Sequence, residues 1–433
     1  MTATLETAVH RPVKPLRVAV LGQGYVGLPL SMRAVAAGHD VIGVELSTAR
    51  VKRLADGDSF VEDVPRVVLE AALRSGRYAI TDDAAACEGF DVAVVTVPTP
   101  LHEGAPDLSF IESAAHMLAP YVRPGCLVVL ESTTYPGTTE QLFAPILENG
   151  SGLIAGTDFS VGYSPERIDP GNQTWDLETT PKLVSGLGER SLDRTDEFYS
   201  TFVQRTVRVS DCKAAEMAKL LENTFRHVNV ALVNELAMFA SDLGIDVWEA
   251  IDAAATKPFG FMKFTPGPGV GGHCLPIDPS YLSWTVRQRL GRSFRFVELA
   301  NDINDHMPDY VASRLMRALN RHGIAMSRAQ VLVLGLAYKR NAGDARESPS
   351  VALIHRLVAD GAEVAVADPH VVEDMPVDAI TRRVELSREE IERADAVVLV
   401  TDHDAFDYDL VQRHAKLVLD TRHRLDGPDV EQL

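Results

Sequence analysis

The chain has 433 residues, of which 46% are hydrophobic, so it is long enough for two or three packed domains. Its 61 acidic residues outnumber the 42 Lys and Arg residues, and the formal net charge is −19. A protein this acidic repels nucleic acid and anionic membrane surfaces, so we expect neither as a partner. An anionic substrate would need a local basic pocket.

The four cysteines, Cys87, Cys126, Cys212 and Cys274, are far apart and form no CxxC pair. This spacing predicts neither a zinc site nor a disulfide framework, and we expect no metal. Residues 1–15 contain no apolar segment, and no stretch approaches the ~20 apolar residues that span a bilayer. We therefore expect a disordered tail at 1–15 and a reduced, cytoplasmic protein.

From residue 16, short β-branched runs alternate with amphipathic stretches. This rhythm is typical of a parallel sheet covered by helices on both faces. The runs are RVAVLG, DVIGVEL, YAIT, DVAVVTVP and CLVVLEST. The sequence therefore predicts an α/β domain over residues 16–210.

A glycine-rich turn follows the first of these runs. Gly22, Gly24 and Gly27 form G-x-G-x-x-G between RVAVL and a helical run, where glycines let backbone N–H groups approach a pyrophosphate. Glu45 closes the next strand, where an acid accepts hydrogen bonds from ribose hydroxyls and repels a 2′-phosphate. This favours NAD over NADP, although Arg50 could accept a phosphate. The alternative is a glycine turn that serves packing only.

A long helical pattern runs from Asp211 to about Leu243 and is stopped by Gly244. It would serve as a connector and as a dimer surface. The Gly/Pro-rich stretch TPGPGVGGHCLPIDP, residues 265–279, predicts a tight loop among helices. A second α/β rhythm follows between residues 331 and 420, with the runs VLVLGLAY, EVAVAD, AVVLVTD and KLVLD.

Cys274 and Asp278 lie four residues apart in this loop. A cysteine thiolate adds to an aldehyde, and hydride loss from the thiohemiacetal gives a thioester, which completes a second oxidation. Asp278 would then activate water as a general base. A buried structural cysteine is the alternative, and His273 would act either as a base or in packing.

Four further polar residues are placed near a site by their spacing. Lys219 and Asn223 are spaced i, i+4 on the long helix, where two donors on one face could stabilise an oxyanion. A solvated pair is the alternative. Thr133 and Glu166 follow apolar strands, which puts them near the carboxyl edge of the sheet, where α/β sites lie.

Seven motifs occur in one order along the chain: GQGYVGLPL, VTVPTP, ESTTYPGTTE, YSPER, EMAKLLENTFRHVNVALVNELA, PGPGVGGHCLPIDPSYL and GLAYKRNAGDARESPS. They resemble the UDP-glucose/GDP-mannose dehydrogenase family over residues 16–425. The resemblance implies an NAD-binding Rossmann domain at 16–210, a central helical dimerisation domain at 211–318 and a nucleotide-sugar-binding Rossmann-like domain at 319–433. We therefore predict an α/β protein with two doubly wound parallel sheets joined by a long central helix, and a homodimer.

Residue by residue, the resemblance makes Cys274 the nucleophile, Lys219 and Asn223 the oxyanion-stabilising pair, and Asp278 and Thr133 the residues that handle water and protons. The predicted catalytic residues are Cys274, Lys219, Asn223, Asp278, Thr133 and Glu166. The predicted NAD-binding residues are Gly22, Gly24, Tyr25, Val26, Gly27, Glu45, Arg50, Pro98, Thr99 and Thr133. The predicted substrate-binding residues are Glu166, Arg167, Lys219, Asn223, Gly271, Lys339 and Arg346.

The segments GGHC, SPERIDPGN and KPFGFMKFTPGPG are most similar to the branch that acts on UDP-N-acetylhexosamines. Members that act on UDP-glucose often place an Arg about sixteen residues before the nucleophile, where it reaches the sugar of the partner subunit. Pro258 occupies that position here, with Lys257 beside it, so this contact across the dimer stays open. Ser293 stands where similar sequences have Pro, a change that alters stability more than chemistry.

We therefore predict oxidation of a nucleotide-diphospho-sugar C6 alcohol to a uronate with two NAD⁺, through a thioester on Cys274. The sugar nucleotide is a UDP-N-acetylhexosamine, UDP-glucose or TDP-glucose. Two other functions remain open: a single-step hydroxyacid dehydrogenase, which needs no cysteine, and a sensor that binds NAD or a nucleotide sugar without turnover.

Overall fold

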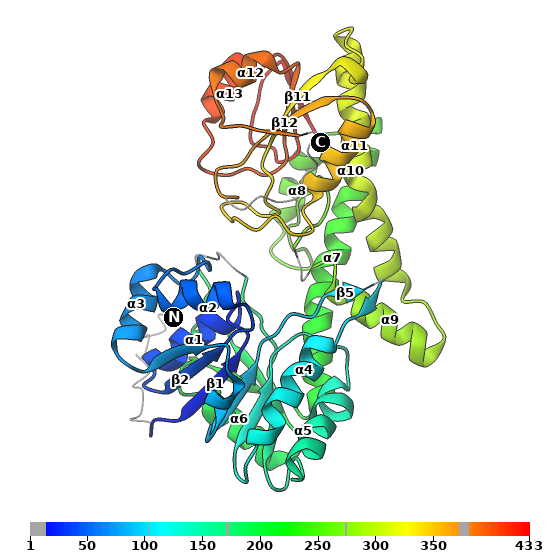
Figure 1. Cartoon of the computed structure of the whole chain (residues 1–433). Coiled ribbons are helices and arrows are strands. Elements are labelled where there is room, and N and C mark those ends of the chain that lie inside the picture. The colour runs from blue at the N-terminus through cyan, green and yellow to red at the C-terminus, as the bar shows by residue number, and fades with distance from the viewer. Residues whose placement is uncertain (1–13, 103, 170–171, 173, 273–274, 372–380) are drawn as a thin grey trace, which may run out of the picture. The chain divides into compact units, whose positions relative to one another are not determined.

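The computed structural model of the chain describes residues 14–102, 104–169, 172, 174–272, 275–371 and 381–433. Cys274 and His273 lie outside these ranges. The described residues divide into two compact units between Glu222 and Asn223. This boundary falls inside the long helix α7 (Cys212–Leu243), which begins and ends within a residue of the predicted helix (Figure 1).

The first unit is built on a sheet with the strand order β10-β9-β8-β7-β4-β1-β2-β3. The strands are β1 (Arg17–Leu21), β2 (Asp40–Val44), β3 (Tyr78–Thr81), β4 (Val92–Val95), β7 (Leu127–Leu130), β8 (Ser160–Tyr163), β9 (Lys182–Gly186) and β10 (Thr206–Arg208). From β3 to β8 the pairings are parallel, in the doubly wound order of a Rossmann sheet. A small antiparallel hairpin, β5 (Leu101–His102) and β6 (Ala105–Pro106), follows β4.

Helices cover both faces of this sheet because successive strand residues point to opposite sides. Val18 and Val20 of β1 pack in one apolar cluster with α1, α2, α3 and α6, whereas Ala19 and Leu21 pack in another with α4 and α5. These helices are α1 (Gly27–Ala36), α2 (Thr48–Ala55), α3 (Arg66–Arg74), α4 (Ser109–Leu118), α5 (Ala144–Ser151) and α6 (Glu189–Tyr199). Burial on both faces explains why the central strands are apolar throughout.

The second unit joins a helical part to a second parallel sheet. Its helices are α8 (Val247–Ala255), α9 (Asp278–Leu290), α10 (Arg295–Arg321), α11 (Pro349–Ala359), α12 (Arg388–Arg393) and α13 (Tyr408–His414). Its strands are β11 (Gln330–Leu334), β12 (Glu363–Ala367), β13 (Arg382–Arg383), β14 (Ala396–Leu399), β15 (Val418–Asp420) and β16 (Val430–Gln432). Their order, β13-β12-β11-β14-β15-β16, repeats the Rossmann arrangement, and the prediction of two Rossmann-like sheets is confirmed.

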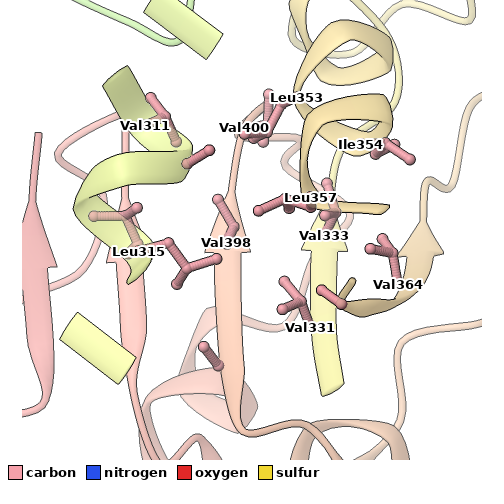
Figure 2. Packing of buried hydrophobic residues seen from close by; sticks show 14 of the residues in the cluster. Val311, Leu315, Val331, Val333, Leu353, Ile354, Leu357, Val364, Val398 and Val400 are labelled. Carbon is pink, nitrogen blue, oxygen red and sulfur yellow. The ribbon is translucent and has the colours of Figure 1, made fainter. Parts of the chain in front are cut away.

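The core of the second unit shows how its helical part is attached to the sheet. Figure 2 shows Val311 and Leu315 of α10 and Leu353 and Leu357 of α11 pointing toward the same sheet face, where β11 and β14 present valines. The second half of α10, from Met307 to Leu319, contributes to this core, whereas Ala300 and Ile303 pack with Ala231 of α7. α10 therefore joins the helical part and the sheet in one packed body.

The fold corrects the sequence prediction in two places. β9 runs antiparallel to β8, so the first sheet is not parallel throughout. The Gly/Pro-rich loop ends at Ile277 rather than at residue 279, because α9 already begins at Asp278 with Pro279 in its first turn. Proline is tolerated there since its missing N–H would have no partner in the helix.

Candidate active site

The glycine turn after β1 has the backbone geometry that a pyrophosphate requires. Gly22 has φ of +89°, and a Cβ on it would lie 2.7 Å from the Thr96 carbonyl oxygen. A Cβ on Gly27 would overlap the Gly22 carbonyl oxygen, so only glycine lets α1 start this close to β1. A Cβ on Gly24 would meet no described atom within 4 Å. Packing thus explains Gly22 and Gly27, whereas the space at Gly24 is open for a ligand at the N-terminus of α1.

Glu45 lies directly after β2, beside this turn. Its two carboxylate oxygens accept hydrogen bonds from the backbone N–H groups of Gln23, at 3.2 Å, and Ser47, at 3.0 Å. Arg50 lies 3.9 Å from the same carboxylate and stacks on Phe60. A fixed carboxylate at the end of β2 is the arrangement that binds a ribose diol. The carboxylate also pairs with the Arg50 guanidinium, which could otherwise bind a 2′-phosphate.

Gln23 is a residue that the sequence prediction missed. Its buried amide donates to the Val20 carbonyl, and its side-chain oxygen accepts hydrogen bonds from Ser31 and Tyr78. These contacts tie the glycine turn to α1 and β3. The sequence did offer a signal, because Gln23 places an amide between Gly22 and Gly24, and a buried amide needs hydrogen-bond partners.

The predicted residues Pro98, Thr99 and Thr133 follow strands β4 and β7, which are neighbours in the sheet. Ser132 links the two strand ends through its hydroxyl, which donates to the Val97 carbonyl at 2.8 Å. Because β1 pairs with β4, all these residues lie at the carboxyl edge that carries the glycine turn.

Glu166 and Arg167, in the YSPER motif after β8, are held by ionic contacts within the first unit. Glu166 accepts hydrogen bonds from the N–H groups of Arg167 and Ile168, both at 2.6 Å, and from Lys182, at 3.3 Å. Arg167 forms a two-point salt bridge with Glu222 on α7. Both side chains are therefore positioned by protein partners.

Lys182 is the centre of a buried network that the sequence did not reveal. Its ammonium contacts Glu166 and, at 3.2 Å, the fully buried Glu131, which also accepts a hydrogen bond from Tyr199. Burial raises the pKa of Glu131 to about 7, because desolvation of the carboxylate outweighs the attraction of Lys182. Burial alone would lower the pKa of Lys182, but the two carboxylates raise it, so the lysine stays charged.

Lys219 and Glu216 lie on α7, and their environments differ. Glu216 is buried and accepts hydrogen bonds from the N–H groups of Gly137 and Thr139, which anchors the helix to the loop after β7. Lys219 is only 7% exposed, yet in the described part of the chain it forms no hydrogen bond or ion pair. A buried ammonium group without a protein partner is costly unless a ligand supplies one.

Asn223, one turn further along α7, donates a hydrogen bond of 2.5 Å to Asp278, the first residue of α9. Both side chains are buried, at 6% and 3% exposure. The structure therefore brings together two of the predicted catalytic residues within the second unit. The hydrogen bond fixes the orientation of the Asp278 carboxylate relative to α7.

The predicted substrate residues of the second unit come from two segments that are in contact. A Cβ on Gly271 would clash with Tyr338, Glu347 and Pro349, and the Gly272 N–H donates to the Arg346 carbonyl. The Gly/Pro-rich loop thus packs on the stretch that carries Lys339 and Arg346. Arg346 itself is exposed and pairs with Asp344.

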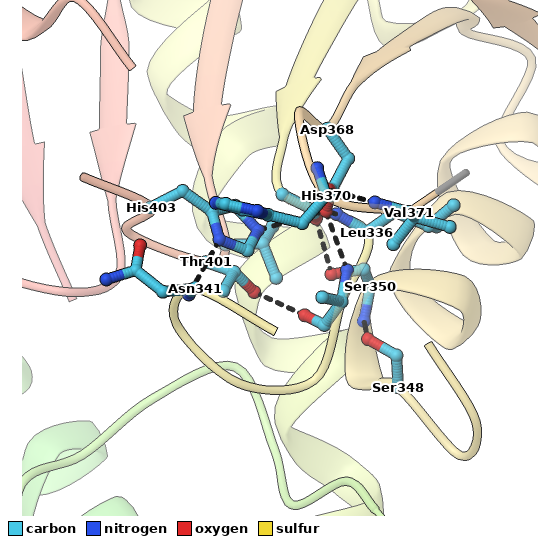
Figure 3. A network of polar contacts seen from close by, with 12 residues as sticks. Leu336, Asn341, Ser348, Ser350, Asp368, His370, Val371, Thr401 and His403 are labelled. Atoms are coloured by element: carbon cyan, nitrogen blue, oxygen red, sulfur yellow. Dashed lines mark hydrogen bonds and ion pairs between the residues drawn. The ribbon is translucent and has the colours of Figure 1, made fainter. Parts of the chain in front are cut away.

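This stretch is held by a network around Asp368, at the end of β12 (Figure 3). Asp368 accepts hydrogen bonds from the Leu336 and Ala337 N–H groups and from His403, whose other ring nitrogen accepts one from the Asn341 N–H. These contacts lower the pKa of Asp368 far below its usual range, against the effect of burial. The Leu336 N–H therefore bonds to an acid directly after β12, as the Gln23 N–H bonds to Glu45 directly after β2.

Arg422, after β15, is a candidate ligand that sequence reasoning missed. Its Nε donates to the Val400 carbonyl at 2.6 Å, and a Cβ on Gly267 would lie 2.9 Å from its Nη1. In the described residues its two terminal nitrogens form no hydrogen bond or ion pair. A partly buried guanidinium with free donors beside the Gly/Pro-rich loop suits an anion.

A cavity of about 510 Å³ also lies in the second unit, between α10, α11 and the Gly/Pro-rich loop. Its acidic lining includes Asp305 and Glu347. Burial and the neighbouring Asp302 raise the pKa of Asp305. The cavity is therefore a poorer place for an anionic substrate than the surroundings of Arg422.

Comparison with known proteins covers both units. Three consecutive domains of one family match: the NAD binding domain of the UDP-glucose/GDP-mannose dehydrogenase family at residues 16–203, its central domain at 213–306 and its UDP binding domain at 332–427. The chain belongs to this family. NAD as cofactor and an NAD-dependent nucleotide-sugar dehydrogenase are thereby confirmed.

Named relatives share nearly the whole length. A UDP-N-acetyl-D-mannosamine dehydrogenase of Pyrococcus horikoshii is 37% identical over 96% of this chain and 97% of its own. An NDP-N-acetyl-D-galactosaminuronic acid dehydrogenase of Ralstonia solanacearum is 35% identical over 94% and 95%. The solved structure of a UDP-glucose dehydrogenase from Pyrobaculum islandicum has a TM-score of 0.88 at 28% identity and covers 98% of each chain.

In the described ranges, no helix is both long and apolar enough to cross a bilayer. Nor do the described His, Cys, Asp and Glu side chains form a cluster that could hold a metal ion. Cys87, Cys126 and Cys212 are free and buried, and burial raises the pKa of each thiol.

Gly24→Ala and Gly27→Ala are expected to fail in different ways. The methyl group of Gly24→Ala meets open space, so the thermal unfolding temperature should stay within a few degrees while NAD⁺ binding weakens about tenfold or more. In Gly27→Ala the methyl overlaps backbone atoms, so the fold itself should lose stability. Calorimetric unfolding and NAD⁺ titration measure the two effects. Unchanged NAD⁺ affinity in a folded Gly24→Ala would contradict this assignment of the open space.

Proposed function

We propose that this protein oxidises the C6 hydroxymethyl group of a nucleotide-diphospho-sugar to a carboxylate. The balanced reaction is R–CH₂OH + 2 NAD⁺ + H₂O giving R–COO⁻ + 2 NADH + 3 H⁺. The match to all three domains of one dehydrogenase family is the observation that carries this proposal. NAD⁺, when bound at the glycine turn, accepts one hydride in each oxidation.

The chemistry requires a nucleophile for the second oxidation. Cys274 adds to the C6 aldehyde and forms a thiohemiacetal, and loss of hydride from C6 converts this to a thioester. Water then attacks the thioester carbonyl, the C–S bond breaks, and the uronate leaves. The buried, raised-pKa thiols of the other three cysteines make them poor substitutes, because the thiolate is the reactive form.

Lys219, Asn223 and Asp278 suit the charge changes at C6. The ammonium of Lys219 and the amide of Asn223 are donors on one face of α7, and both stabilise an oxygen that becomes negative. Asp278 takes the proton from the attacking water, and its hydrogen bond from Asn223 keeps it oriented.

The nucleotide half of the substrate is bound in the domain that contains Lys339, Arg346 and Arg422. Arg422→Met is expected to raise the KM for the nucleotide sugar about 10- to 100-fold, the value of a hydrogen bond to a charged group, and to leave the KM for NAD⁺ unchanged. Arg413→Met, at an exposed arginine on α13, is the control. Equal KM values in Arg422→Met and the wild type would remove Arg422 from the site.

We infer a UDP-N-acetylhexosamine as substrate, with UDP-N-acetyl-D-mannosamine tested first, because relatives at 35–37% identity carry names from this group. The test measures NADH at 340 nm with limiting UDP-N-acetyl-D-mannosamine, UDP-N-acetylglucosamine, UDP-glucose and TDP-glucose. Two NADH per sugar from an N-acetylhexosamine support the proposal, and two from a glucose nucleotide correct the sugar only. One NADH per sugar would indicate a single-step dehydrogenase, and none with any sugar would favour a sensor.

We also propose a homodimer formed through α7. Six of its large apolar side chains are at least 45% exposed at helical spacing: Leu221, Phe225, Leu232, Leu236, Phe239 and Leu243. A solvent-exposed apolar stripe of this length is typical of a protein interface. Light scattering should give about 94 kDa, twice 47.2 kDa, and Leu236→Asp should lower it to one chain mass. Ile154→Asp, at another exposed apolar position, should not, and a monomeric wild type would exclude this interface.

A further inference from the structure

A continuous chain of hydrogen bonds runs through the interior of the second unit and starts at the Gly/Pro-rich loop. The Gly267 N–H donates to the side-chain oxygen of Asn234 on α7, at 2.9 Å. The Asn234 amide donates to Asn304 on α10, also at 2.9 Å, and the Asn304 amide donates to Nδ1 of His227 at 3.4 Å. Asn234, Asn304 and His227 are each at most 3% exposed, so water does not compete for these contacts.

The chain continues from the other side of the imidazole back to the same loop. Nε2 of His227 donates to the Asn301 side-chain oxygen at 2.7 Å. The Asn301 amide donates to Ser280 at 3.4 Å, and the Ser280 hydroxyl donates to the Pro276 carbonyl at 3.2 Å. The two ends of the chain, Gly267 and Pro276, flank the loop segment whose sequence includes Cys274.

The direction of every bond is consistent with one form of His227. Nδ1 faces an amide N–H and must accept, whereas Nε2 faces an amide oxygen and must donate, so the ring is neutral with its proton on Nε2. Burial lowers the pKa of His227, in agreement with a neutral ring. A second proton on Nδ1 would face the Asn304 amide donor and break the chain at its centre.

We propose that His227 is a positioning residue, which clamps both ends of the Gly/Pro-rich loop through this chain so that the loop keeps its catalytic geometry. The proposal rests on the proposed function for the role of Cys274. Asn234 and Asn304 also link α7 to α10 and both donate and accept. His227 differs because its donor and its acceptor lie on opposite sides of one rigid ring. His227 lies one turn after Asn223 on α7. The helix whose Asn223 bonds to Asp278 therefore also carries His227, the centre of the clamp.

Two substitutions separate the hydrogen-bonding role from the volume of the ring. His227→Gln retains one donor and one acceptor, whereas His227→Leu removes both. The Asn301 oxygen and the Asn304 amide then lose their imidazole partner, although the Asn304 amide keeps its 3.5 Å contact with the carbonyl of residue 227. Thr285→Val on α9 is the matched control, because it removes a buried hydroxyl that only bonds within its own helix, to the Tyr281 carbonyl.

Activity and loop protection are measured on the full-length protein with NAD⁺ and the nucleotide sugar that the NADH assay identifies. His227→Leu should lower kcat on the order of 10- to 100-fold, because displacing a catalytic loop by ~1 Å costs about this much, with the KM for NAD⁺ unchanged. His227→Gln should recover kcat to within a few-fold of the wild type. Hydrogen exchange of the peptide around Gly267 should speed up in His227→Leu only, whereas Thr285→Val should match the wild type in both readouts.

The hydrogen-exchange measurement does not depend on the reaction. It therefore tests the His227 clamp separately from the thioester mechanism. A folded His227→Leu variant with wild-type kcat and wild-type exchange would overturn the clamp. If His227→Gln loses as much activity as His227→Leu, the shape of the imidazole ring, and not its hydrogen bonds, would explain the effect. If the wild type transfers only one hydride while exchange still responds as expected, the clamp stands and the thioester mechanism fails.

Discussion

Cys274→Ala is expected to lower the production of uronate by roughly three orders of magnitude or more, as loss of a covalent nucleophile does in other enzymes. Alanine has no group that adds to the C6 aldehyde, so neither thiohemiacetal nor thioester forms. NADH yield at 340 nm and mass spectrometry of the sugar product measure the effect. Any residual product should be the aldehyde, with one NADH per sugar.

The matched control is Cys126→Ala. Cys126 is 1% exposed and packs in the core of the first unit, where burial raises its pKa. Its substitution should leave two NADH per sugar, with a change in thermal stability only. A Cys274→Ala variant that still produces two NADH per sugar would contradict the covalent mechanism, because both oxidations would then proceed without a thioester.

Lys219→Met is expected to lower kcat on the order of 10²- to 10³-fold, the typical effect of removing one oxyanion donor. Its thermal unfolding temperature should not fall, because the substitution removes a buried charge that has no protein partner in the described residues. Rapid-mixing kinetics of the first NADH and calorimetric unfolding measure the two effects.

Lys182→Met is the contrasting variant. Lys182 is also buried, at 2% exposure, but pairs with Glu131 and Glu166, so its removal leaves two carboxylates without a cation and should cost about 3–5 kcal/mol of unfolding free energy. If burial of the lysine alone set the effect, Lys219→Met and Lys182→Met would change the unfolding free energy by the same amount. If Lys219→Met is destabilised as much as Lys182→Met, Lys219 has a structural partner and its assignment as an oxyanion donor is wrong.

Predictions based on periodicity succeeded where local pattern and tertiary packing agree. The apolar runs of β1, β4 and β11 and the helix α7 were predicted from the sequence because their side-chain period matches the face that they bury. Strands β9 and β10 were not, since KLVSG and TVR contain few apolar residues in a row, and β8 was expected only as an apolar strand before Glu166. β9 even begins with Lys182, which is buried only because β7 and β8 supply carboxylates beside it.

The site divides in the same way. The glycine turn and Glu45 could be predicted because a dinucleotide site is made by consecutive backbone groups and the next strand. Arg422 and His227 could not, because their importance depends on residues far away in the chain. Arg422 is next to Gly267, 155 residues away (422 − 267), and His227 meets Asn301 and Asn304 from another helix.

By itself, the sequence determined the class of fold, the family and the cofactor, because each of these depends on local pattern: strand and helix periods, the G-x-G-x-x-G turn and seven ordered motifs. Only the tertiary structure decided which charges are paired and which are free. Lys182 and Lys219 look alike in sequence, yet one is paired with two carboxylates and the other forms no hydrogen bond or ion pair with the residues that the structure describes. The physical reason is that burial and pairing, which set the energy of a charge, depend on neighbours brought together by folding.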